Sequence, residues 1–347
     1  MTSRVGFRVD AAVMLGGGHV MRCLTLARTF RDLGHICTFL CSEETLEVIP
    51  EDLWDGFNVR TIASLNSYET DERYDLLVID HYGIAEPEER KWRSQAGTLM
   101  VIDDLADRRH DCDLLLDQTY EVKAADYEAL VPANCRMLLG TNYALLREEF
   151  AAHRPASLER RMDRPIGGRV LVSLGMTDVD GIAGRVCTLL KNIGNLRKVD
   201  VVLDRKAASH AQIRDICASD GRFQIHCDVR NMAELMLLAD VAIGAGGTTT
   251  WERCAMGVPS IVLVLADNQT KIADLMNKAG AIGLLGDVRK DTDLQLSDRM
   301  TQFLSNAEQL RAFGKRSAAL CDGAGARRVV EDVLQLVAMR KGINGYV

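Results

Sequence analysis

The stretch that decides the fold is Val5-Gly6-Phe7-Arg8-Val9-Asp10, followed by Gly16-Gly17-Gly18-His19-Val20-Met21-Arg22-Cys23-Leu24. The first run is typical of a short buried strand, and the glycines indicate a turn. After His19, apolar residues recur at the three- to four-residue steps of an amphipathic helix. The same order of strand, turn and helix continues along the chain. Near-continuous apolar strands alternating with helices predict a parallel sheet covered on both faces.

The length of 347 residues predicts two such domains. Residues 1–150 form the first, with strands expected at 5–9, 36–40, 58–62, 76–79, 99–102, 114–116 and 137–139. Residues 169–325 form the second, with strands expected at 170–174, 199–203, 223–226, 241–243 and 261–265. Residues 151–168 are charged, contain two prolines and end in a glycine pair, which predicts an interdomain linker. Residues 326–347 have a helical pattern and could pack back on the first domain.

The composition excludes several classes of protein. An apolar fraction of 47% argues against disorder, and a net charge of −7 argues against nucleic acid or an anionic membrane as the main partner. The ten cysteines contain no CxxC pair, so we expect reduced thiols. Charges near the N-terminus do not fit a signal peptide, and no apolar run is long enough to span a bilayer. These features predict a cytoplasmic protein and leave its oligomeric state open.

The first glycine turn carries the first candidate site. Gly17 and Gly18 allow close approach of a ligand, and His19 follows them at a predicted helix start. The positive end of the helix dipole favours a neutral ring, which can act as a base. A histidine that only caps the helix remains an alternative. A dinucleotide fingerprint would require glycine where Met21 stands, so a nicotinamide or flavin dehydrogenase is not favoured.

The second candidate site lies in the second half, where an expected strand ends in small residues and hydroxyls. The stretch is Ile243-Gly244-Ala245-Gly246-Gly247-Thr248-Thr249-Thr250-Trp251-Glu252. Glycines and threonine hydroxyls ahead of a helix predict a diphosphate-binding loop, and Glu252 is placed to accept hydrogen bonds from ribose. It is not a P-loop, because no Gly-Lys-Ser/Thr follows. A capping box formed by Thr249 and Glu252 is the structural alternative.

Other strand ends supply weaker candidates. Gly175, which follows Ser173-Leu174, and the Asn268-Gln269 pair could line a nucleotide-sugar pocket. Asp80-His81-Tyr82 and Asp103-Asp104 close two strands of the first half. Their side chains could in principle bind a metal, but no metal-ligand spacing such as HExxH is present, so no metal is expected.

With these residues in view, the chain resembles the UDP-sugar hydrolases of pseudaminic acid biosynthesis, which are related to B-type glycosyltransferases. The resemblance is carried, in order, by Phe7-Arg8-Val9-Asp10, Gly16-Gly17-Gly18-His19-Val20-Met21-Arg22-Cys23-Leu24, Val78-Ile79-Asp80-His81-Tyr82, Ile102-Asp103-Asp104-Leu105-Ala106-Asp107-Arg108, Tyr143-Ala144-Leu145-Leu146-Arg147-Glu148-Glu149-Phe150, Gly246-Gly247-Thr248-Thr249-Thr250-Trp251-Glu252-Arg253-Cys254 and Asn268-Gln269. It implies two Rossmann-like doubly wound domains facing a cleft.

The resemblance also implies an activity, the hydrolysis of UDP-2,4-diacetamido-2,4,6-trideoxy-β-L-altropyranose to UDP and the free sugar. It implies that His19 activates water, that Tyr82 lies near the reacting groups, and that no metal or organic cofactor takes part. The UDP-sugar side would include the glycine-threonine loop from Ala245 to Thr249, Glu252 and the Asn268-Gln269 pair. The family motif Gly-Gly-Thr-Asp has Met176 in place of its second glycine here, which leaves the sugar less certain than the nucleotide.

Two other functions remain open at this point. A B-type glycosyltransferase would have the same fold and nucleotide site, but His19 would deprotonate an acceptor hydroxyl. A non-catalytic nucleotide-sugar sensor would bind a UDP-sugar without turnover, and His19 would be dispensable.

Overall fold

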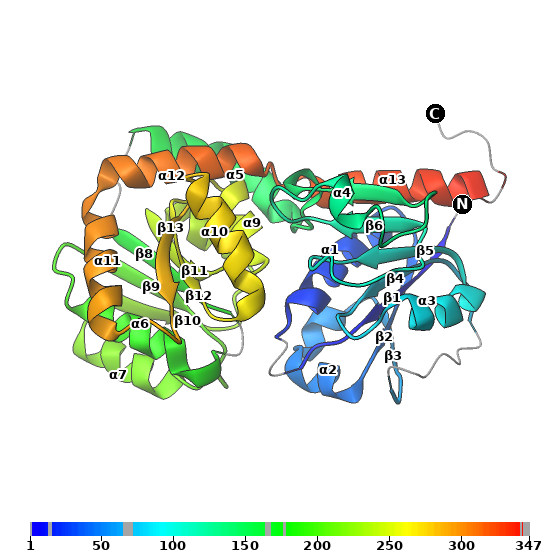
Figure 1. The fold of residues 1–347 in the computed structure, drawn as a ribbon. Coiled ribbons are helices and arrows are strands. Elements are labelled where there is room, and N and C mark those ends of the chain that lie inside the picture. Colours follow the sequence, from blue (N-terminus) through cyan, green and yellow to red (C-terminus); the bar gives the residue numbers. More distant parts are fainter. Residues whose placement is uncertain are drawn as a thin grey trace. The chain divides into compact units, whose positions relative to one another are not determined.

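The computed structural model describes residues 2–12, 16–64, 72–163, 168–175, 178–340 and 342. The chain divides into two compact units, drawn in Figure 1. Unit 1 comprises Met1–Leu146 together with Ala324–Val347, and unit 2 comprises Arg147–Gly323. No helix in these described ranges is long and apolar enough to cross a membrane.

In its described part, unit 1 contains a seven-stranded parallel sheet in the order β3-β2-β1-β4-β5-β6-β7. The strands are β1 Arg4–Val9, β2 Ile36–Cys41, β3 Asn58–Thr61, β4 Tyr74–Asp80, β5 Ala96–Ile102, β6 Leu114–Asp117 and β7 Arg136–Leu139. The α-helices are α1 Gly18–Asp32, α2 Glu43–Val48, α3 Glu86–Trp92, α4 Ala124–Tyr127 and α13 Gly325–Arg340. Short 3-10 turns are η1 Glu51–Trp54, η2 Arg93–Gln95 and η3 Thr141–Tyr143.

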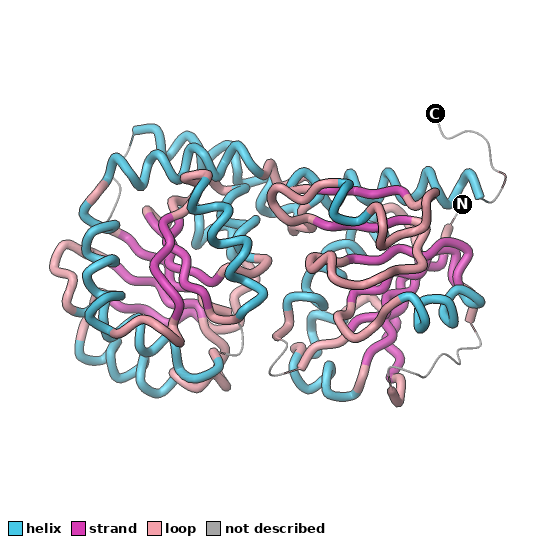
Figure 2. Tube along the Cα trace, in the orientation of Figure 1, coloured by secondary structure: helices cyan, strands magenta, loops and turns pink. Residues whose placement is uncertain are grey.

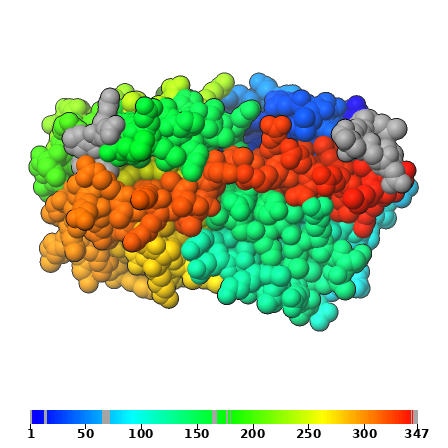
Figure 3. Space-filling view, turned by 90° about the horizontal axis from the view of Figure 1, so that it is seen from above, coloured from blue at the N-terminus to red at the C-terminus, as the bar shows by residue number. Residues whose placement is uncertain are grey.

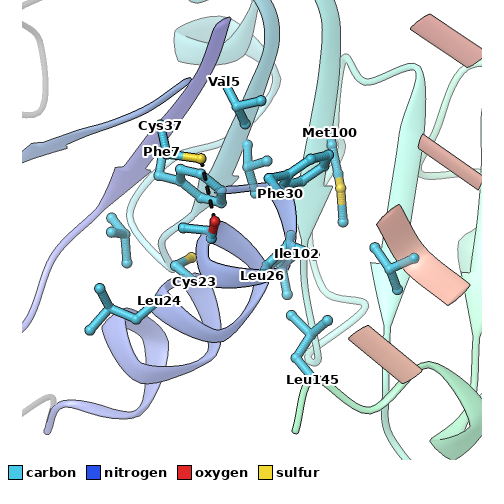
Figure 4. Close-up of a cluster of buried hydrophobic side chains, with 14 of the residues drawn as sticks. Val5, Phe7, Cys23, Leu24, Leu26, Phe30, Cys37, Met100, Ile102 and Leu145 are labelled. Carbon is cyan, nitrogen blue, oxygen red and sulfur yellow. Dashed lines mark hydrogen bonds between the residues drawn. The ribbon is translucent and has the colours of Figure 1, made fainter. Parts of the chain in front are cut away.

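The sheet of unit 1 is covered on both faces because its inner strands carry apolar side chains on both sides. On one face, Val5, Phe7 and Met100 of the sheet pack with Leu26 and Phe30 of α1 (Figure 4). Helix α13 contributes a run of buried valines to the same cluster: Val329, Val330, Val333 and Val337. On the other face, buried residues of β4 and β5 pack with Trp92 of α3 and Tyr127 of α4.

The last helix returns to the first unit of the chain. Helix α13 contacts α1, β5 and η3, and Figure 3 shows it in red between blue and green segments of unit 1. Its Arg340 donates to Asp113 at 2.7 Å, and Arg328 donates to the carbonyl of Asn142 at 2.8 Å. Residues more than 300 positions after β1 therefore complete the core around β1.

Unit 2 repeats the same scheme, and Figure 2 shows its strands in magenta with helices around them. In the part described, its parallel sheet has six strands in the order β10-β9-β8-β11-β12-β13. The strands are β8 Arg169–Ser173, β9 Lys198–Val202, β10 Phe223–His226, β11 Val241–Ala245, β12 Ser260–Val264 and β13 Gly283–Asp287. The helices are α5 Glu148–Asp163, α6 Ile182–Lys191, α7 His210–Ser219, α8 Met232–Leu238, α9 Thr249–Ala255, α10 Thr270–Lys278, α11 Asp293–Ser305 and α12 Ala307–Leu320, with turns η4 Val179–Gly181 and η5 Asp267–Gln269.

The predicted fold class, two doubly wound parallel α/β domains, is confirmed by these two sheets. All twelve expected strands are present, with ends shifted by up to three residues. The sequence did not predict β13, whose Gly-Leu-Leu-Gly-Asp is interrupted by glycines.

The predicted linker at residues 151–168 is wrong over most of its length, because α5 occupies Glu148–Asp163. Charge and Pro155 suggested a loop, but tertiary hydrogen bonds hold the helix to unit 2. Ser157 Oγ donates to the carbonyl of Met256 at 2.6 Å, and Arg161 Nη2 donates to that of Met236 at 2.7 Å. The unit boundary accordingly falls at Arg147.

Candidate functional site

Each unit has a point where the strand order reverses, and ligands of doubly wound sheets bind at such points. In unit 1 it lies between β1 and β4, whose ends Val9 and Asp80 are paired in register. In unit 2 it lies between β8 and β11, where Ser173 pairs with Gly244. His19 follows β1, and the glycine-threonine loop follows β11, so both predicted turns lie at these points.

His19 is the second residue of α1, and a buried carboxylate holds its ring. The side chain is 8% exposed, and its Nδ1 lies 2.6 Å from Oδ1 of Asp80, the last residue of β4. The N-cap of α1 is Gly17, and no side chain caps this helix. The interpretation of His19 as a helix cap is therefore wrong. Asp80, when ionised, can only accept a hydrogen bond, so in the neutral form of the ring the proton lies on Nδ1 and the lone pair on Nε2.

Arg22 fixes this carboxylate from one turn further along α1. Its Nε donates to Oδ2 of Asp80 and its Nη2 to Oδ1, both at 2.6 Å, in a bidentate pair. Burial alone raises the pKa of Asp80, but the charges of Arg22 and His19 and their hydrogen bonds outweigh it and hold that pKa well below its usual range. Asp80 is therefore an anion throughout the neutral range.

The network extends from Arg22 to Tyr82. Arg22 Nη1 donates to Oδ2 of Asp104 at 2.9 Å, and the Tyr82 hydroxyl donates to Oδ1 of the same carboxylate at 2.9 Å. The rings of His19 and Tyr82 meet edge to face, with centroids 4.5 Å apart and planes at 89°. The structure thus brings His19 and Tyr82 together in unit 1.

A cavity of about 290 Å³ lies at the same edge of the sheet, beside β1, β2 and β4. Arg8, Asp10, Ser42 and His81 are among the residues that line it. Asp10 accepts hydrogen bonds from Arg8 at 2.7 Å and from the backbone N–H of Ser42 at 2.7 Å. Burial and the nearby charge of Arg8 lower the pKa of His81. The polar groups of this cavity are therefore largely paired with one another.

In unit 2, the glycine-threonine loop is tied to a neighbouring turn by one amide side chain. Gln269 Oε1 accepts hydrogen bonds from the backbone N–H of Gly246 at 3.3 Å and of Leu265 at 3.1 Å. Gly247, Thr248 and Thr249 are half-buried and follow directly. Asn268 is exposed beside Gln269, and the exposed Gly175 lies two residues beyond the end of β8 at the same sheet edge.

Glu252 does not form the capping box that its spacing from Thr249 allows. The N-cap of α9 is Thr248, without a side-chain cap hydrogen bond. The carboxylate is 16% exposed and lies 3.8 Å from Nη2 of Arg147, which pairs more closely with Glu149 at 2.9 Å. Burial raises the pKa of Glu252, against the opposing charges of Arg147 and Arg253. That Glu252 accepts hydrogen bonds from ribose stays a prediction.

Met176, where the sequence departs from the family motif, lies outside the described residues. Within the described ranges, no group of three or more His, Cys, Asp or Glu side chains is arranged to hold a metal ion. Two further residues, Arg22 and Arg253, belong to the two sites although the sequence had suggested no role for them, and Asp104, considered there as a possible metal ligand, accepts hydrogen bonds from Arg22 and Tyr82. The available signal for Arg22 was its spacing of three residues from His19, which places both side chains on one face of α1.

No protein family model matches the chain. It is 26% identical over 280 residues to UDP-2,4-diacetamido-2,4,6-trideoxy-beta-L-altropyranose hydrolase from Campylobacter jejuni, covering 80% of this chain and 97% of that protein. It is 25% identical over 340 residues to the spore coat polysaccharide biosynthesis protein SpsG of Bacillus subtilis, covering 94% and 96%.

Among solved structures, MurG of Acinetobacter baumannii superposes with a TM-score of 0.67 at 14% identity, covering 96% of this chain and all of that one. At this identity the likeness concerns the fold alone. The chain therefore has the two-unit fold of B-type glycosyltransferases, and its resemblance to the UDP-sugar hydrolases of pseudaminic acid biosynthesis is confirmed.

Proposed function

We propose that this protein is an enzyme that hydrolyses a UDP-linked amino sugar, UDP-2,4-diacetamido-2,4,6-trideoxy-β-L-altropyranose, to UDP and the free sugar. Similarity to the Campylobacter jejuni hydrolase over 80% of the chain supports the substrate class. The observation that carries the reaction type is the His19–Asp80 pair, with its 2.6 Å contact and its Arg22 support. A histidine oriented by a buried carboxylate is the arrangement of a general base.

In the proposed reaction, His19 Nε2 removes a proton from a water molecule. The water oxygen attacks the anomeric carbon, and the bond from that carbon to the diphosphate oxygen breaks, so that its electron pair leaves with UDP. Asp80 stabilises the imidazolium that forms. Attack from the face opposite the leaving group releases the sugar with inverted configuration. Tyr82, whose ring touches that of His19, lies beside the reacting groups.

The nucleotide is assigned to unit 2. In this assignment, the diphosphate is bound by the loop residues Ala245, Gly246, Gly247, Thr248 and Thr249, and the ribose hydroxyls are bound by Glu252. The long 3.8 Å contact with Arg147 supports this role, because it leaves the carboxylate of Glu252 able to accept stronger hydrogen bonds. Gly17, Gly18, Gly175, Asn268 and Gln269 complete the proposed substrate-binding set.

The deciding experiment supplies the UDP-sugar and water and omits any acceptor. Release of UDP and free sugar in equal amounts, with the sugar first seen by NMR as the inverted anomer, is the expected result. Binding without release would indicate a sensor, and release that requires an added acceptor would indicate a glycosyltransferase. The variant His153→Gln is the control for histidine replacement, because His153 lies on α5, where its Nδ1 is 2.9 Å from the carbonyl oxygen of Glu149, and not in either candidate site.

A further inference from the structure

A buried arginine lies directly beneath the glycine-threonine loop of unit 2. Arg253, in α9 (Figure 1), is 2% exposed. Its Nη2 donates to the carbonyl of Ala245 at 2.8 Å and to Thr250 Oγ1 at 3.0 Å, and its Nη1 donates to Thr249 Oγ1 at 3.0 Å. A Cβ on Gly244 would clash with the guanidinium of Arg253, so a larger residue at this position would force Arg253 to move. The guanidinium thus fills the space behind the loop.

Arg253 forms no salt bridge with a carboxylate among the residues that the structure describes, although the charge of the neighbouring Glu252 acts on it. Its hydrogen-bond acceptors are one carbonyl and two hydroxyls, and its Nε has no partner. Burial lowers the pKa of Arg253 to about 10, which still leaves the group protonated at neutral pH. An unpaired buried cation is costly, and an anion arriving at the loop would reduce that cost.

The hydrogen bond to Thr249 also sets the direction of a donor. Thr249 Oγ1 accepts from Arg253, so its own hydrogen is directed elsewhere. Thr249 is half-buried at the surface of the loop, whereas Thr250 is buried and donates to the carbonyl of Ala245 at 3.3 Å. Of these two hydroxyls, Thr249 is therefore the one free to donate to a ligand.

We propose that Arg253 is a positioning residue for diphosphate binding: it fixes the Thr249 hydroxyl as a donor and places a buried positive charge without a salt bridge behind the loop. The ligand it serves is a nucleoside diphosphate, or inorganic pyrophosphate as its minimal form. This inference rests on the proposed function, since that function assigns the diphosphate to this loop.

The test compares UDP, uridine and pyrophosphate by calorimetric titration of the wild-type protein and Arg253→Met. The expected result is a loss of UDP and pyrophosphate affinity of about tenfold or more, as for a charge-assisted contact, with uridine affinity changed by less than about twofold. Arg253→Lys, which keeps the charge, should recover part of the loss. Equal weakening of UDP and uridine would show that Arg253 only maintains the loop, and would overturn the inference.

Arg161→Met is the matched control. Arg161 is another buried arginine of unit 2, bonded to the carbonyls of Met236 and Ala239 and to Ser157, with its pKa lowered by burial to about 9. Its loss should reduce thermal stability and leave the ratio of UDP to uridine affinity unchanged. The inference fails if Arg161→Met lowers that ratio as much as Arg253→Met does.

Two further measurements separate a failure of this inference from a failure of the proposed function. Thr249→Val removes the oriented hydroxyl, and with it one acceptor of Arg253, but keeps the buried guanidinium, so it tests the inference if Arg253→Met does not fold. It should lower the affinity for UDP and leave the affinity for uridine unchanged, and an unchanged UDP affinity would count against the inference.

If the wild-type protein binds pyrophosphate through Arg253 but does not bind UDP, the proposed function is wrong and the role of Arg253 stands. If it binds neither, both are wrong.

Discussion

Replacing Asp80 with asparagine perturbs the unit 1 site at its centre while nearly preserving the shape of the side chain. The carboxylate accepts hydrogen bonds at 2.6 Å from His19 and, twice, from Arg22. Asparagine keeps one oxygen and turns an NH₂ group toward one of those donors. His19 then loses the partner that fixes its proton on Nδ1. A comparable loss of a histidine's carboxylate partner in a serine protease reduces kcat by about 10⁴, and we expect a fall of at least about a hundredfold here.

The same change also affects stability, because Arg22 is 3% exposed and would keep only Asp104, itself 19% exposed, as a counter-charge. Breaking one side of a buried ion pair typically costs about 3–5 kcal/mol in the free energy of unfolding. The pKa of Asp80 is depressed in the folded state. Its stabilising contribution is therefore fully present above the unfolded pKa of about 4 and is lost as pH falls below it. Between about pH 5 and pH 2, the free energy of unfolding of Asp80→Asn should therefore fall less than that of the wild-type protein.

Urea unfolding at several pH values measures the stability, and kcat per folded molecule measures the catalytic effect. Asp113→Asn is the control, since Asp113 is also a buried carboxylate of unit 1, 7% exposed and paired with Arg93 and Arg340. It should lower stability and leave kcat unchanged. An Asp80→Asn enzyme with wild-type kcat per folded molecule would refute the argument that Asp80 orients the base.

Three other substitutions and one competition experiment test the remaining assignments. His19→Leu should lower kcat by about a hundredfold or more and leave UDP affinity unchanged in titration; an active variant would remove His19 as the base. Glu252→Ala should weaken UDP binding by about 1.5–3 kcal/mol without loss of melting temperature. Tyr82→Phe removes the hydrogen bond to Asp104 and should lower kcat more than it changes KM. UDP should inhibit turnover more strongly than GDP or ADP, and equal inhibition would contradict the uridine assignment.

Most of the fold could be predicted because most of its strands and helices have a recognisable pattern within a short stretch of sequence. Most strands before β13 contain a short apolar run bounded by polar residues or glycine, and the length and period of that run suffice to recognise a strand. The failures were at β13 and α5, where local signals conflict with tertiary contacts. Helix α5 contains Pro155 and many charges, yet Ser157 and Arg161 bind carbonyls of Met256 and Met236 that lie far along the chain.

The positions of the candidate sites could be predicted from the sequence, but the contacts between their side chains could not. The glycine turns identified His19 and the loop before Glu252, because strand ends at a switch point are a general position for ligands. Their partners are distant: Asp80 is 61 residues from His19, and Asp104 is 82 residues from Arg22. A carboxylate at a strand end has the same local pattern whether it binds a metal, caps a helix or orients a histidine. Only the pairing of β1 with β4 brings Asp80 to His19.

The two points where the strand order reverses share a topology, but they differ in how completely their polar groups are paired with hydrogen-bond partners and opposite charges. In unit 1, Asp80 and Asp104 accept hydrogen bonds from Arg22 and His19 at 2.6–2.9 Å, so the ring orientation is set before any ligand arrives. In unit 2, Arg253 forms no salt bridge with a carboxylate among the described residues, and Glu252 has a partner only at 3.8 Å. Groups already satisfied can lower a barrier without reorganisation, whereas groups left unsatisfied gain most when a ligand binds. Substitutions in the first network should therefore act mainly on kcat, and those in the second mainly on the affinity for the nucleotide.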